Sequence, residues 1–472
     1  MSTVESFVAA GPFGDTSVVE VAARIRRRET SALEVTQQAL SAAHRYNPDL
    51  NCFVTIDDEG AERAAVLADR ELQSGLDRGP LHGIPVGVKD MIATAGLRTT
   101  MGSRHFSGHV PTADADVVTS LRNCGAVIIG KTQTHEFAFG PTSDRAATGP
   151  ARNPHDLERM TGGSSGGSGA AVAAGIVPVA LGTDTGGSVR VPAALCGVVG
   201  MRPTYGALSS AGVFPLSPTM DVVGPLAANV RDTAIAWWAL STTSDLAGTF
   251  TPAWSDYPVP DRSRGLSLRF GEVVCELTRK TSGSVQEATG TAISALSRSG
   301  VGISTVDMPE IDECLDPYRI IQSAEAFAIH SERVQQAPEL FDAEVLDRLN
   351  AAAVVRGWEY VRALQTRDRL RSAVLHRLSS VDIVIMPTVP IEAPSIGERE
   401  LDGRAGWTSP RAALLSMTSP WSVLGFPAIS VPVLHSGEQL PRSIQLVGKP
   451  GHEQQLLDAA AALEGSLKAF DG

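Results

Sequence analysis

The sequence has few cysteines and a deficit of positive charge, and each shortage excludes a class of protein. Its 472 residues include five cysteines, widely spaced and without a C-x-x-C pair, which argues against a disulfide framework and a zinc ribbon. The 40 Lys and Arg residues are outnumbered by 52 Asp and Glu residues, so the net charge is −12. We therefore expect neither nucleic acid nor an anionic membrane surface among the partners of this protein.

The sequence also lacks a membrane span and a secretory signal. The longest nearly apolar run, residues 170–182, contains Pro178 and is far shorter than the roughly 20 residues that a helix needs to cross a bilayer. The first residues lack a basic stretch followed by an apolar core. The expected location is the cytoplasm.

The order of apolar patterns predicts an α/β fold. Apolar residues recur at helical spacing over 16–47, with a break near 29–31, and again over 60–75. Two helix-like segments are each followed by a short buried strand, which is typical of crossover units; they are 116–123 before 126–130, and 168–175 before 176–181. Residues 245–375 look polar and mostly helical, and strands return at 381–387, 427–433 and 443–447 before a last helix at 453–467. We expect one large sheet closed by both ends of the chain.

A glycine-rich segment, residues 161–169 with the sequence TGGSSGGSG, is the most unusual stretch. A phosphate-binding loop would need Lys and then Ser or Thr after its last glycine, and these are missing. A flexible linker is disfavoured because a helix and a buried strand follow at once. Two interpretations stay open: a tight turn, or a strained catalytic loop that presents Ser164 or Ser165.

A second loop, residues 182–190, directly follows the predicted strand 176–181. Ligands of α/β sheets gather at the carboxyl ends of strands. Consecutive N–H groups of Thr185, Gly186, Gly187 and Ser188 could form a nest for an oxyanion, with the Ser188 hydroxyl in the same cavity. The loop is not a G-x-S-x-G elbow, because Val-Arg follows the serine.

A nucleophilic serine needs a base, and no histidine lies in a distinctive motif. His82 and His135 are the best placed, and a structural role is favoured for both. Lys89 ends the apolar run 84–88, where a solvated lysine is not expected. Because a buried lysine loses its charge easily, it can act as a base; a structural pairing with Asp90 or another carboxylate is an equal alternative.

Four ordered motifs carry a resemblance to a known family: 83–90, 161–169, 182–190 and 196–204, with further matches at 386–388, 425–432 and 445–448. On these residues the chain resembles the amidase signature family of serine hydrolases. The resemblance covers nearly the whole chain and weakens between about 245 and 375. It implies a large twisted mixed sheet of about eleven strands between helices, in a single domain. Its parts would be N-terminal helices (1–78), a signature core (79–230), a variable helical segment that shapes the substrate site (245–375), and C-terminal strands with a helix (380–472).

The resemblance also implies residue roles. Ser188 would be the nucleophile, Ser164 a bridging serine preceded by a cis peptide bond, and Lys89 the neutral terminal base. The remaining positions would be the oxyanion and substrate residues Thr185, Gly186, Gly187, Phe139, Gly140 and Pro141, and the loop-holding residues Ser165, Asp184 and Arg190. The implied chemistry needs no metal and no organic cofactor.

Some positions depart from the family pattern. Gln133 replaces a frequent Asn, Met201-Arg202 replaces Leu-Lys, and Ser422 stands where Asn is common; the last change is expected to alter the pocket wall.

The implied substrate is a small-molecule amide, carbamate or ester. Apolar residues at Phe137, Phe139 and Phe214 favour an aryl or alkyl acyl group over a charged one, so an aryl amide or a carbamate (urethane) is the expected substrate.

Two alternatives to a self-sufficient amidase remain. A glutaminase subunit of an aminoacyl-tRNA amidotransferase complex would share all the motifs, but the segment 357–361 resembles generic amidases more than such subunits, where an Arg-Tyr-Gly stretch is usual. A non-catalytic binding relative is disfavoured because all three triad residues are present. A homodimer is possible, since homodimers are common in the family.

Overall fold

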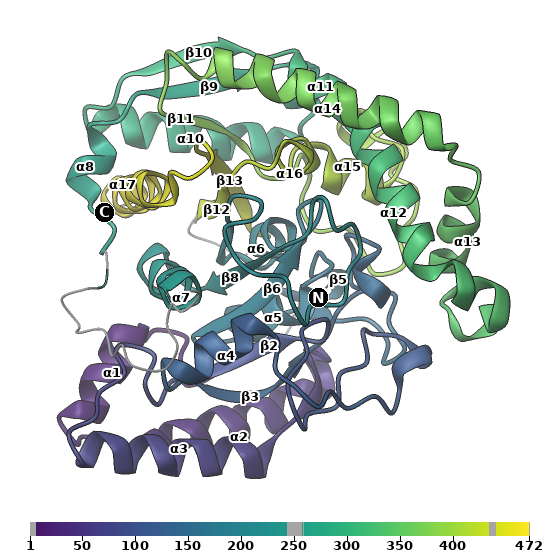
Figure 1. Ribbon diagram of the computed structural model, residues 1–472. Coiled ribbons are helices and arrows are strands. Elements are labelled where there is room, and N and C mark those ends of the chain that lie inside the picture. Colours follow the sequence, from purple (N-terminus) through teal and green to yellow (C-terminus); the bar gives the residue numbers. More distant parts are fainter. Residues whose placement is uncertain (1–5, 243–256, 258, 434–439, 472) are drawn as a thin grey trace, which may run out of the picture.

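The computed structural model describes residues 6–242, 257, 259–433 and 440–471. Its centre is one mixed sheet of eleven strands (Figure 1). The strands follow one another across the sheet in the order β1 (Phe53–Ile56), β3 (Val127–Thr132), β2 (Pro85–Lys89), β6 (Val179–Asp184), β8 (Val222–Ala227), β7 (Val199–Arg202), β12 (Ala428–Val433), β13 (Arg442–Val447), β11 (Ile383–Pro387), β9 (Phe270–Val274) and β10 (Ile303–Asp307). A separate hairpin pairs β4 (Arg152–Asn153) with β5 (Asp156–Met160). This is the amidase-type sheet that the resemblance implies.

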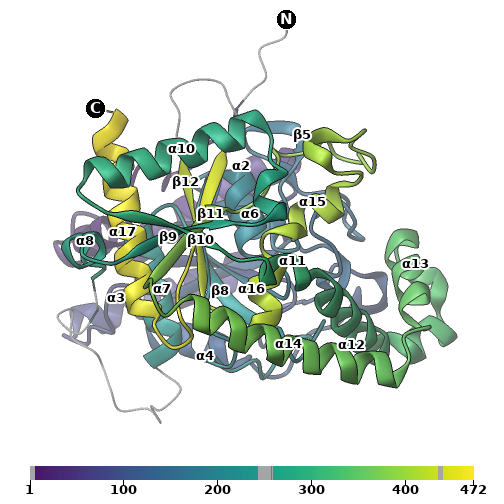
Figure 2. The same ribbon diagram turned by 90° about the horizontal axis from the view of Figure 1, so that it is seen from above.

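Helices cover both faces of this sheet (Figure 2). They are α1 (Val18–Arg26), α2 (Ala32–Leu50), α3 (Asp58–Gln73), α4 (Asp116–Asn123), α5 (Gly166–Ala173), α6 (Arg190–Cys196), α7 (Val230–Thr242), α8 (Arg262–Leu266), α9 (Glu276–Arg279), α10 (Gly283–Arg298), α11 (Glu310–Glu313), α12 (Leu315–Gln336), α13 (Ala343–Ala352), α14 (Gly357–Arg377), α15 (Pro410–Ser416), α16 (Ser419–Leu424) and α17 (Glu453–Asp471). Strand β7 shows how the two faces divide. Val199 and Met201 pack with residues of α7, α10 and α17, whereas a side chain at Gly200 would collide with Ala193 of α6 on the other face.

The N-terminal helices agree with the predicted pattern. The break near 29–31 separates α1 from α2, and α2 begins at a capping box in which Ser31 and Glu34 bond each other's backbone N–H groups. Helices α2 and α3 lie side by side below the sheet edge formed by β3 and β1 (Figure 1).

Strands β2, β3 and β6 are parallel neighbours, so their carboxyl ends meet at one edge of the sheet. The last residue of β2 is Lys89, and β6 ends at Asp184. The predicted strand 176–181 is shifted to 179–184. The N–H groups of Gly175 and Ile176 still donate to the end of α5, and Pro178 has no N–H for the sheet ladder.

The prediction that residues 245–375 are mostly helical is correct, but it missed two strands that this segment adds to the sheet. Residues 243–256 lie outside the described part of the chain. Helices α10 and α12 to α14 dominate the rest, but the segment also contributes β9 and β10. Strand β10 forms the outer edge of the sheet, whereas the C-terminal strands β12 and β13 lie inside it, so the two chain ends do not close the sheet. Edge strand β10 has exposed residues at Ser304 and Thr305, and this polar pattern hides it from periodicity analysis.

None of the helices in the described residues is long and apolar enough to cross a membrane. Helices α12, α13 and α14 form a layer at the outside of the molecule (Figures 1 and 2). Helix α12 contacts α16, which follows α15 in the C-terminal part of the chain. These two parts of the chain meet beside the carboxyl ends of β2 and β6, as the contacts of Tyr318 and Thr418 with Gly186 show.

Candidate active site

Lys89 is the central residue of the candidate site. It is fully buried at the end of β2, and its Nζ donates to Ser164 Oγ and to Thr183 Oγ1 at 2.7 Å each. Burial lowers the pKa of Lys89 to about 7, although the charges of Asp184 and Asp221 oppose this shift. Near neutral pH, a large fraction of the Lys89 side chain is therefore an uncharged amine that can accept a proton.

The alternative pairing of Lys89 with Asp90 is wrong. The Asp90 carboxylate accepts the backbone N–H and the hydroxyl of Thr100, and a long bond from Gly102. Asp90 follows the last residue of β2, and successive side chains of a strand point to opposite faces, so the two side chains diverge. The hydroxyls of Ser164 and Thr183 occupy the place beside the Lys89 amine instead.

The glycine-rich segment is a shaped loop that aims Ser164 at Lys89. The Gly163–Ser164 peptide bond is cis, as the resemblance implies. The carbonyl oxygen of Ser164 accepts from the His135 N–H and from Ser143 Oγ, both at 3.1 Å. A Cβ at Gly163 would lie 2.8 Å from the Ser143 backbone nitrogen, so only glycine fits this close approach.

Ser165 joins this loop to the second one. Its N–H donates to the carbonyl oxygen of Ser188 at 3.2 Å, and its Oγ donates to the Thr183 carbonyl at 3.2 Å. Ser164 and Ser188 are thus held on two loops that are bonded through their backbones. Among the described hydrogen bonds there is none between the hydroxyls of Ser164 and Ser188. Catalytic hydrogen bonds in ligand-free sites are often long and tighten when substrate binds.

Asp184 shapes the second loop. Its buried carboxylate accepts from the N–H groups of Gly187 (2.9 Å) and Val189 (3.3 Å), from two guanidinium nitrogens of Arg190 at 3.0 Å, and from Arg202 at 3.1 Å. Burial alone would raise the pKa of Asp184, but Arg190 and Arg202 hold it well below its usual range. Asp184 therefore remains a carboxylate, and the loop wraps around it.

Of the four backbone N–H groups predicted to form the oxyanion nest, one already has a hydrogen-bond partner in the structure. Because the Gly187 N–H donates to Asp184, it is directed away from a ligand. The N–H groups of Thr185, Gly186 and Ser188 make no backbone hydrogen bond among the described residues. These three amides are free to bind a developing oxyanion, and the Thr185 hydroxyl is anchored by donating to Asp221 at 2.6 Å.

Known proteins share this arrangement of sheet and loops. The family model described as Amidase matches residues 34–457. The chain belongs to the amidase signature family. It is 35% identical to a glutamyl-tRNA(Gln) amidotransferase subunit of Roseiflexus castenholzii over 483 aligned positions, which cover 96% of each chain.

Solved structures agree with this family. A peptide amidase from Stenotrophomonas maltophilia matches with a TM-score of 0.81 and 28% identity, over 97% of this chain and 98% of that one. A chain from a vestigial protein complex linked to the origins of an s-triazine catabolic enzyme matches with a TM-score of 0.89 and 32% identity, over 96% and 98%. This amidase signature protein is therefore a hydrolase that acts on carbon–nitrogen bonds.

The chain departs from the family pattern at Ser422, which is buried and bonds two residues of the second loop. Its hydroxyl accepts from Arg190 at 2.7 Å and donates to Asp184 at 3.2 Å. Arg202, at another departure, donates to the Asp184 carbonyl and to the Met220 carbonyl. Both positions therefore act on the rigidity of the 184–190 loop.

Among the residues predicted to line the acyl pocket, Phe214 lies in the wall of a small cavity of about 10 Å³, which is room for about one water molecule. The cavity wall includes Ala138, Phe214, Thr183 and Thr185. Phe137 is fully buried in an aromatic cluster with Phe106, Phe214, His330 and Phe341 rather than exposed to a ligand. Phe139 is also buried, Pro141 lies in the same buried loop, and Gly140 leaves room for the His135 ring, which a Cβ would meet at 2.2 Å.

The loop before this cavity has a backbone feature that the sequence does not signal. Phe137 and Ala138 both have positive φ angles, of 52° and 58°. Successive non-glycine residues in this region are strained and are typical of functional loops. Ala138 is brought to the cavity wall by this conformation.

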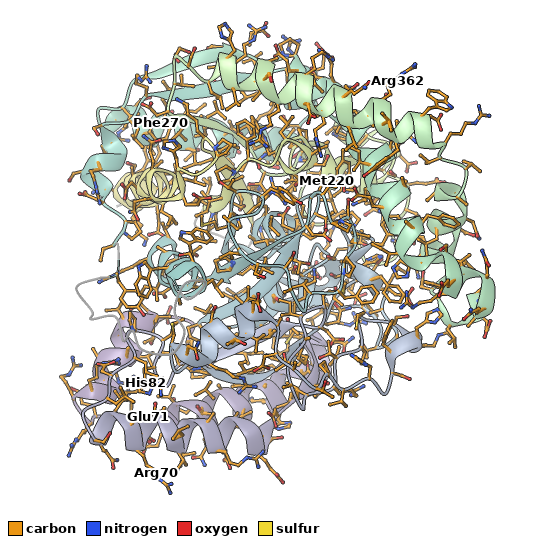
Figure 3. All side chains as sticks on the ribbon, in the orientation of Figure 1. Arg70, Glu71, His82, Met220, Phe270 and Arg362 are labelled. Carbon is orange, nitrogen blue, oxygen red and sulfur yellow. The ribbon has the colours of Figure 1, made fainter. Side chains whose placement is uncertain are left out.

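Among the described hydrogen bonds, neither candidate histidine ring bonds the hydroxyl of Ser164 or Ser188. His82 bonds the Glu71 carboxylate at 3.0 Å and accepts the Arg78 N–H at 3.1 Å. Figure 3 shows His82 and Glu71 together, far from Met220, whose carbonyl accepts from Arg202 beside the second loop. The His135 ring faces Thr142 and Arg348. Burial lowers the pKa of both histidines. The structural role predicted for them fits these contacts.

Three functional candidates have no signal in the sequence: Thr183, Tyr318 and Arg411. Thr183 follows Gly182 at the end of β6, and only the pairing of β6 with β2 places it beside Lys89. Tyr318 lies against Gly186, where an added Cβ would be 2.1 Å from the Tyr318 hydroxyl.

The described residues hold no group of three or more His, Cys, Asp or Glu side chains that could bind a metal ion.

Proposed function

We propose that this protein is a self-sufficient amidase that hydrolyses a small-molecule amide through an acyl-enzyme on Ser188. One observation carries the proposal. An amine with its pKa lowered to about 7 bonds Ser164, on a loop whose next residue bonds the backbone of Ser188. A base, a relay hydroxyl and a nucleophile are thus gathered at one sheet edge.

In the proposed reaction, Ser188 Oγ attacks the substrate carbonyl carbon. The Ser188 proton moves to Ser164 Oγ as Ser164 passes its own proton to the Lys89 amine, so the relay hydroxyl ends unchanged. The N–H groups of Thr185, Gly186 and Ser188 stabilise the tetrahedral oxyanion. The proton then returns through Ser164 to the leaving nitrogen, and the carbon–nitrogen bond breaks. Water hydrolyses the acyl-enzyme by the same relay and releases the acid.

In this scheme the loop-holding residues take no part in proton transfer and instead fix the positions of the two loops. Asp184 and Arg190 fix the path of the second loop, and Ser165 fixes its distance from the first. Gly187 has a φ of 135° and supports the turn, but its N–H serves Asp184. Preorganised amides lose little freedom during the reaction, which is the source of their catalytic effect.

The acyl group in this proposal lies toward the loop 139–141. An aryl amide, a carbamate or an ester remains the finer substrate hypothesis. The aromatic ring of Phe139 in this loop supports an aryl or alkyl portion in the substrate. No nucleic-acid partner is proposed, and a homodimer is compatible with the scheme.

A second candidate function is supported by the curated relatives. The similarity to a glutamyl-tRNA(Gln) amidotransferase subunit covers 96% of each chain. In that case the same site would release ammonia from glutamine inside a larger complex. Purification of the tagged chain from its native cell discriminates the two: a stoichiometric heterotrimer with glutaminase activity supports the amidotransferase, and an active single chain supports the amidase.

The test of the main proposal is hydrolysis of matched primary amides, anilides, carbamates and esters by the purified chain. S188A should abolish turnover, and S164A should lower it strongly. A fluorophosphonate probe should label the wild type at Ser188 and leave S188A unlabelled. Full turnover in S188A would overturn the proposal. The rank order of substrates would identify the leaving group.

A further inference from the structure

We propose that Arg411 binds a carboxylate of the substrate, so that the amide hydrolysed here carries an anionic group near the scissile bond. This inference rests on the proposed function and names its substrate class. Arg411 lies in the first turn of α15, half-buried, and the described ion pairs include none for it. A guanidinium with no carboxylate partner beside an active site is a ready receptor for a substrate anion.

The existing contacts of Arg411 leave most of its donors unfilled. Its two hydrogen bonds among the described residues go to the Phe139 carbonyl at 3.5 Å and to Gln322 Oε1 at 3.4 Å, both at the long limit. Its guanidinium carbon lies 5.4 Å from the centre of the Phe139 ring. A guanidinium has five N–H donors in a planar fork, a shape that matches a carboxylate.

A chain of contacts connects Arg411 to the nucleophile loop. Gln322, which accepts from Arg411, donates through Nε2 to the Tyr318 hydroxyl at 2.7 Å. The Tyr318 hydroxyl lies against Gly186 in the loop that carries Ser188. Thr418, just after α15, donates to the Gly186 carbonyl at 2.6 Å. Arg411 is therefore one layer of side chains from the proposed oxyanion amides.

Positive charge exceeds negative charge around this position. Arg348 donates to the same Phe139 carbonyl at 2.6 Å, so two guanidinium groups converge on one oxygen. Burial and the charge of Arg411 lower the pKa of Arg348 to about 9. Arg348 is compensated by an ion pair with Glu344, which Arg145 and Arg399 also share. A bound anion would relieve the repulsion that remains at Arg411, in a protein whose net charge is otherwise −12.

The test compares two matched pairs of primary amides, glutaramate with valeramide and succinamate with butyramide. Each pair differs by one carboxylate, and two lengths allow for the reach of the side chain. We expect wild type to favour the acids in kcat/KM. R411Q should lower this preference by about tenfold to hundredfold, mainly through KM, as expected for loss of a charge-assisted hydrogen bond. R411K should recover part of it, because Lys keeps the charge without the planar fork.

The control is R404Q. Arg404 lies in the same C-terminal segment, is 43% exposed and pairs with Glu398 at 2.8 Å, so its loss should leave the preference for acids intact. An absence of preference in wild type, or equal losses of R411Q on acid and neutral amide, would overturn the inference.

A binding measurement separates this inference from the proposed function. Calorimetry on S188A should detect glutaramate, and S188A/R411Q should bind it at least about tenfold more weakly. Failure of S188A to bind either acid would overturn the inference even if neutral amides are hydrolysed. Failure of every amide to turn over, with no labelling of Ser188, would overturn the proposed function instead.

Discussion

Two fully buried lysines end neighbouring strands of this sheet, and their surroundings differ in one decisive way. Lys89 ends β2, and Lys131 lies near the end of β3, where it pairs in register with Val88. Because side chains alternate along a strand, the two lysines point to opposite faces of the sheet. Burial lowers the pKa of each to about 7. The pKa alone therefore does not distinguish them.

The partners of the two amines do distinguish them. Lys89 bonds only hydroxyls, those of Ser164 and Thr183. Lys131 donates to the Ile92 carbonyl and to Thr94 Oγ1 at 2.9 Å, and the Thr94 hydroxyl itself donates to Ile92. A hydroxyl can both accept and give a proton, whereas a carbonyl only accepts a hydrogen bond. A proton can thus be passed to the Lys89 amine through a neighbouring hydroxyl. Lys131 has no such route through the Ile92 carbonyl, and its hydrogen bonds support a structural role.

The largest expected effect comes from removing each amine in turn. K89M should lower kcat/KM by about 10²- to 10⁴-fold, the usual contribution of a general base, with little loss of thermal stability. K131M should show the reverse pattern, with most turnover retained and a lower Tm, because the buried Ile92 carbonyl would keep only the long bond from Thr94, and a buried polar group left poorly satisfied costs up to about 1–3 kcal/mol. Steady-state kinetics and thermal unfolding of both variants check this. Similar losses of activity in the two would break the comparison.

The pH dependence of activity is the next largest effect. If uncharged Lys89 is the base, kcat/KM should rise with pH through about 7 and fall about tenfold per pH unit below it. K131M should keep the same acid limb. A pH–rate profile between the acid and alkaline limits of stability checks this, and an acid limb that moves in K131M would show that the wrong lysine was assigned.

Stability should carry a pH signature of both lysines. Their pKa values are near 7 in the folded protein and start from an ordinary value of 10.5, so the unfolded chain binds more protons between these values. The free energy of unfolding due to these groups therefore rises with pH over that window, and this gain is lost as pH falls to about 7. K131M should flatten this slope by about half, and denaturant unfolding at several pH values measures it.

The smallest effect is expected from T183V, which removes one of the two partners of Lys89 and keeps the side-chain shape. Loss of one neutral hydrogen bond should lower kcat/KM by about threefold to tenfold. S164A should have a much larger effect, because Ser164 is the proposed relay. Equal kinetics of T183V and S164A would show that the two hydroxyls serve Lys89 in the same way.

Much of the fold could be predicted from sequence where the signal is local. The break between α1 and α2, the crossover of α4 into β3, and strands β11, β12 and β13 all follow from apolar periodicity, capping residues and turn residues. Strands β9 and β10 could not be predicted, because they are short and β10 has an exposed, polar edge pattern. Strand β9 joins the sheet by pairing with β11, about a hundred residues away, and β10 then pairs with β9. Such long-range pairing leaves no local pattern in the sequence.

The candidate site divides in the same way. Lys89, Ser164 and Ser188 follow from loop composition and the family resemblance, since glycine-rich loops after buried strands are visible in one dimension. Thr183, Tyr318 and Arg411 could not be predicted as site residues, because ordinary Thr, Tyr and Arg positions carry no local signal. The Lys131 amine likewise cannot be told from a surface lysine until the packing is known.

The sequence by itself determined much of the helix–strand order outside residues 245–375, the two loops rich in glycine and serine, and the type of reacting groups. Only the tertiary structure decided which of these groups face one another. The hydrogen bond from Ser422 to Asp184 joins residues 238 positions apart, and the bond from Lys89 to Ser164 joins residues 75 apart. Local conformation follows from neighbouring side chains, whereas the proton affinity of Lys89 follows from burial and from partners that only the folded sheet brings to it.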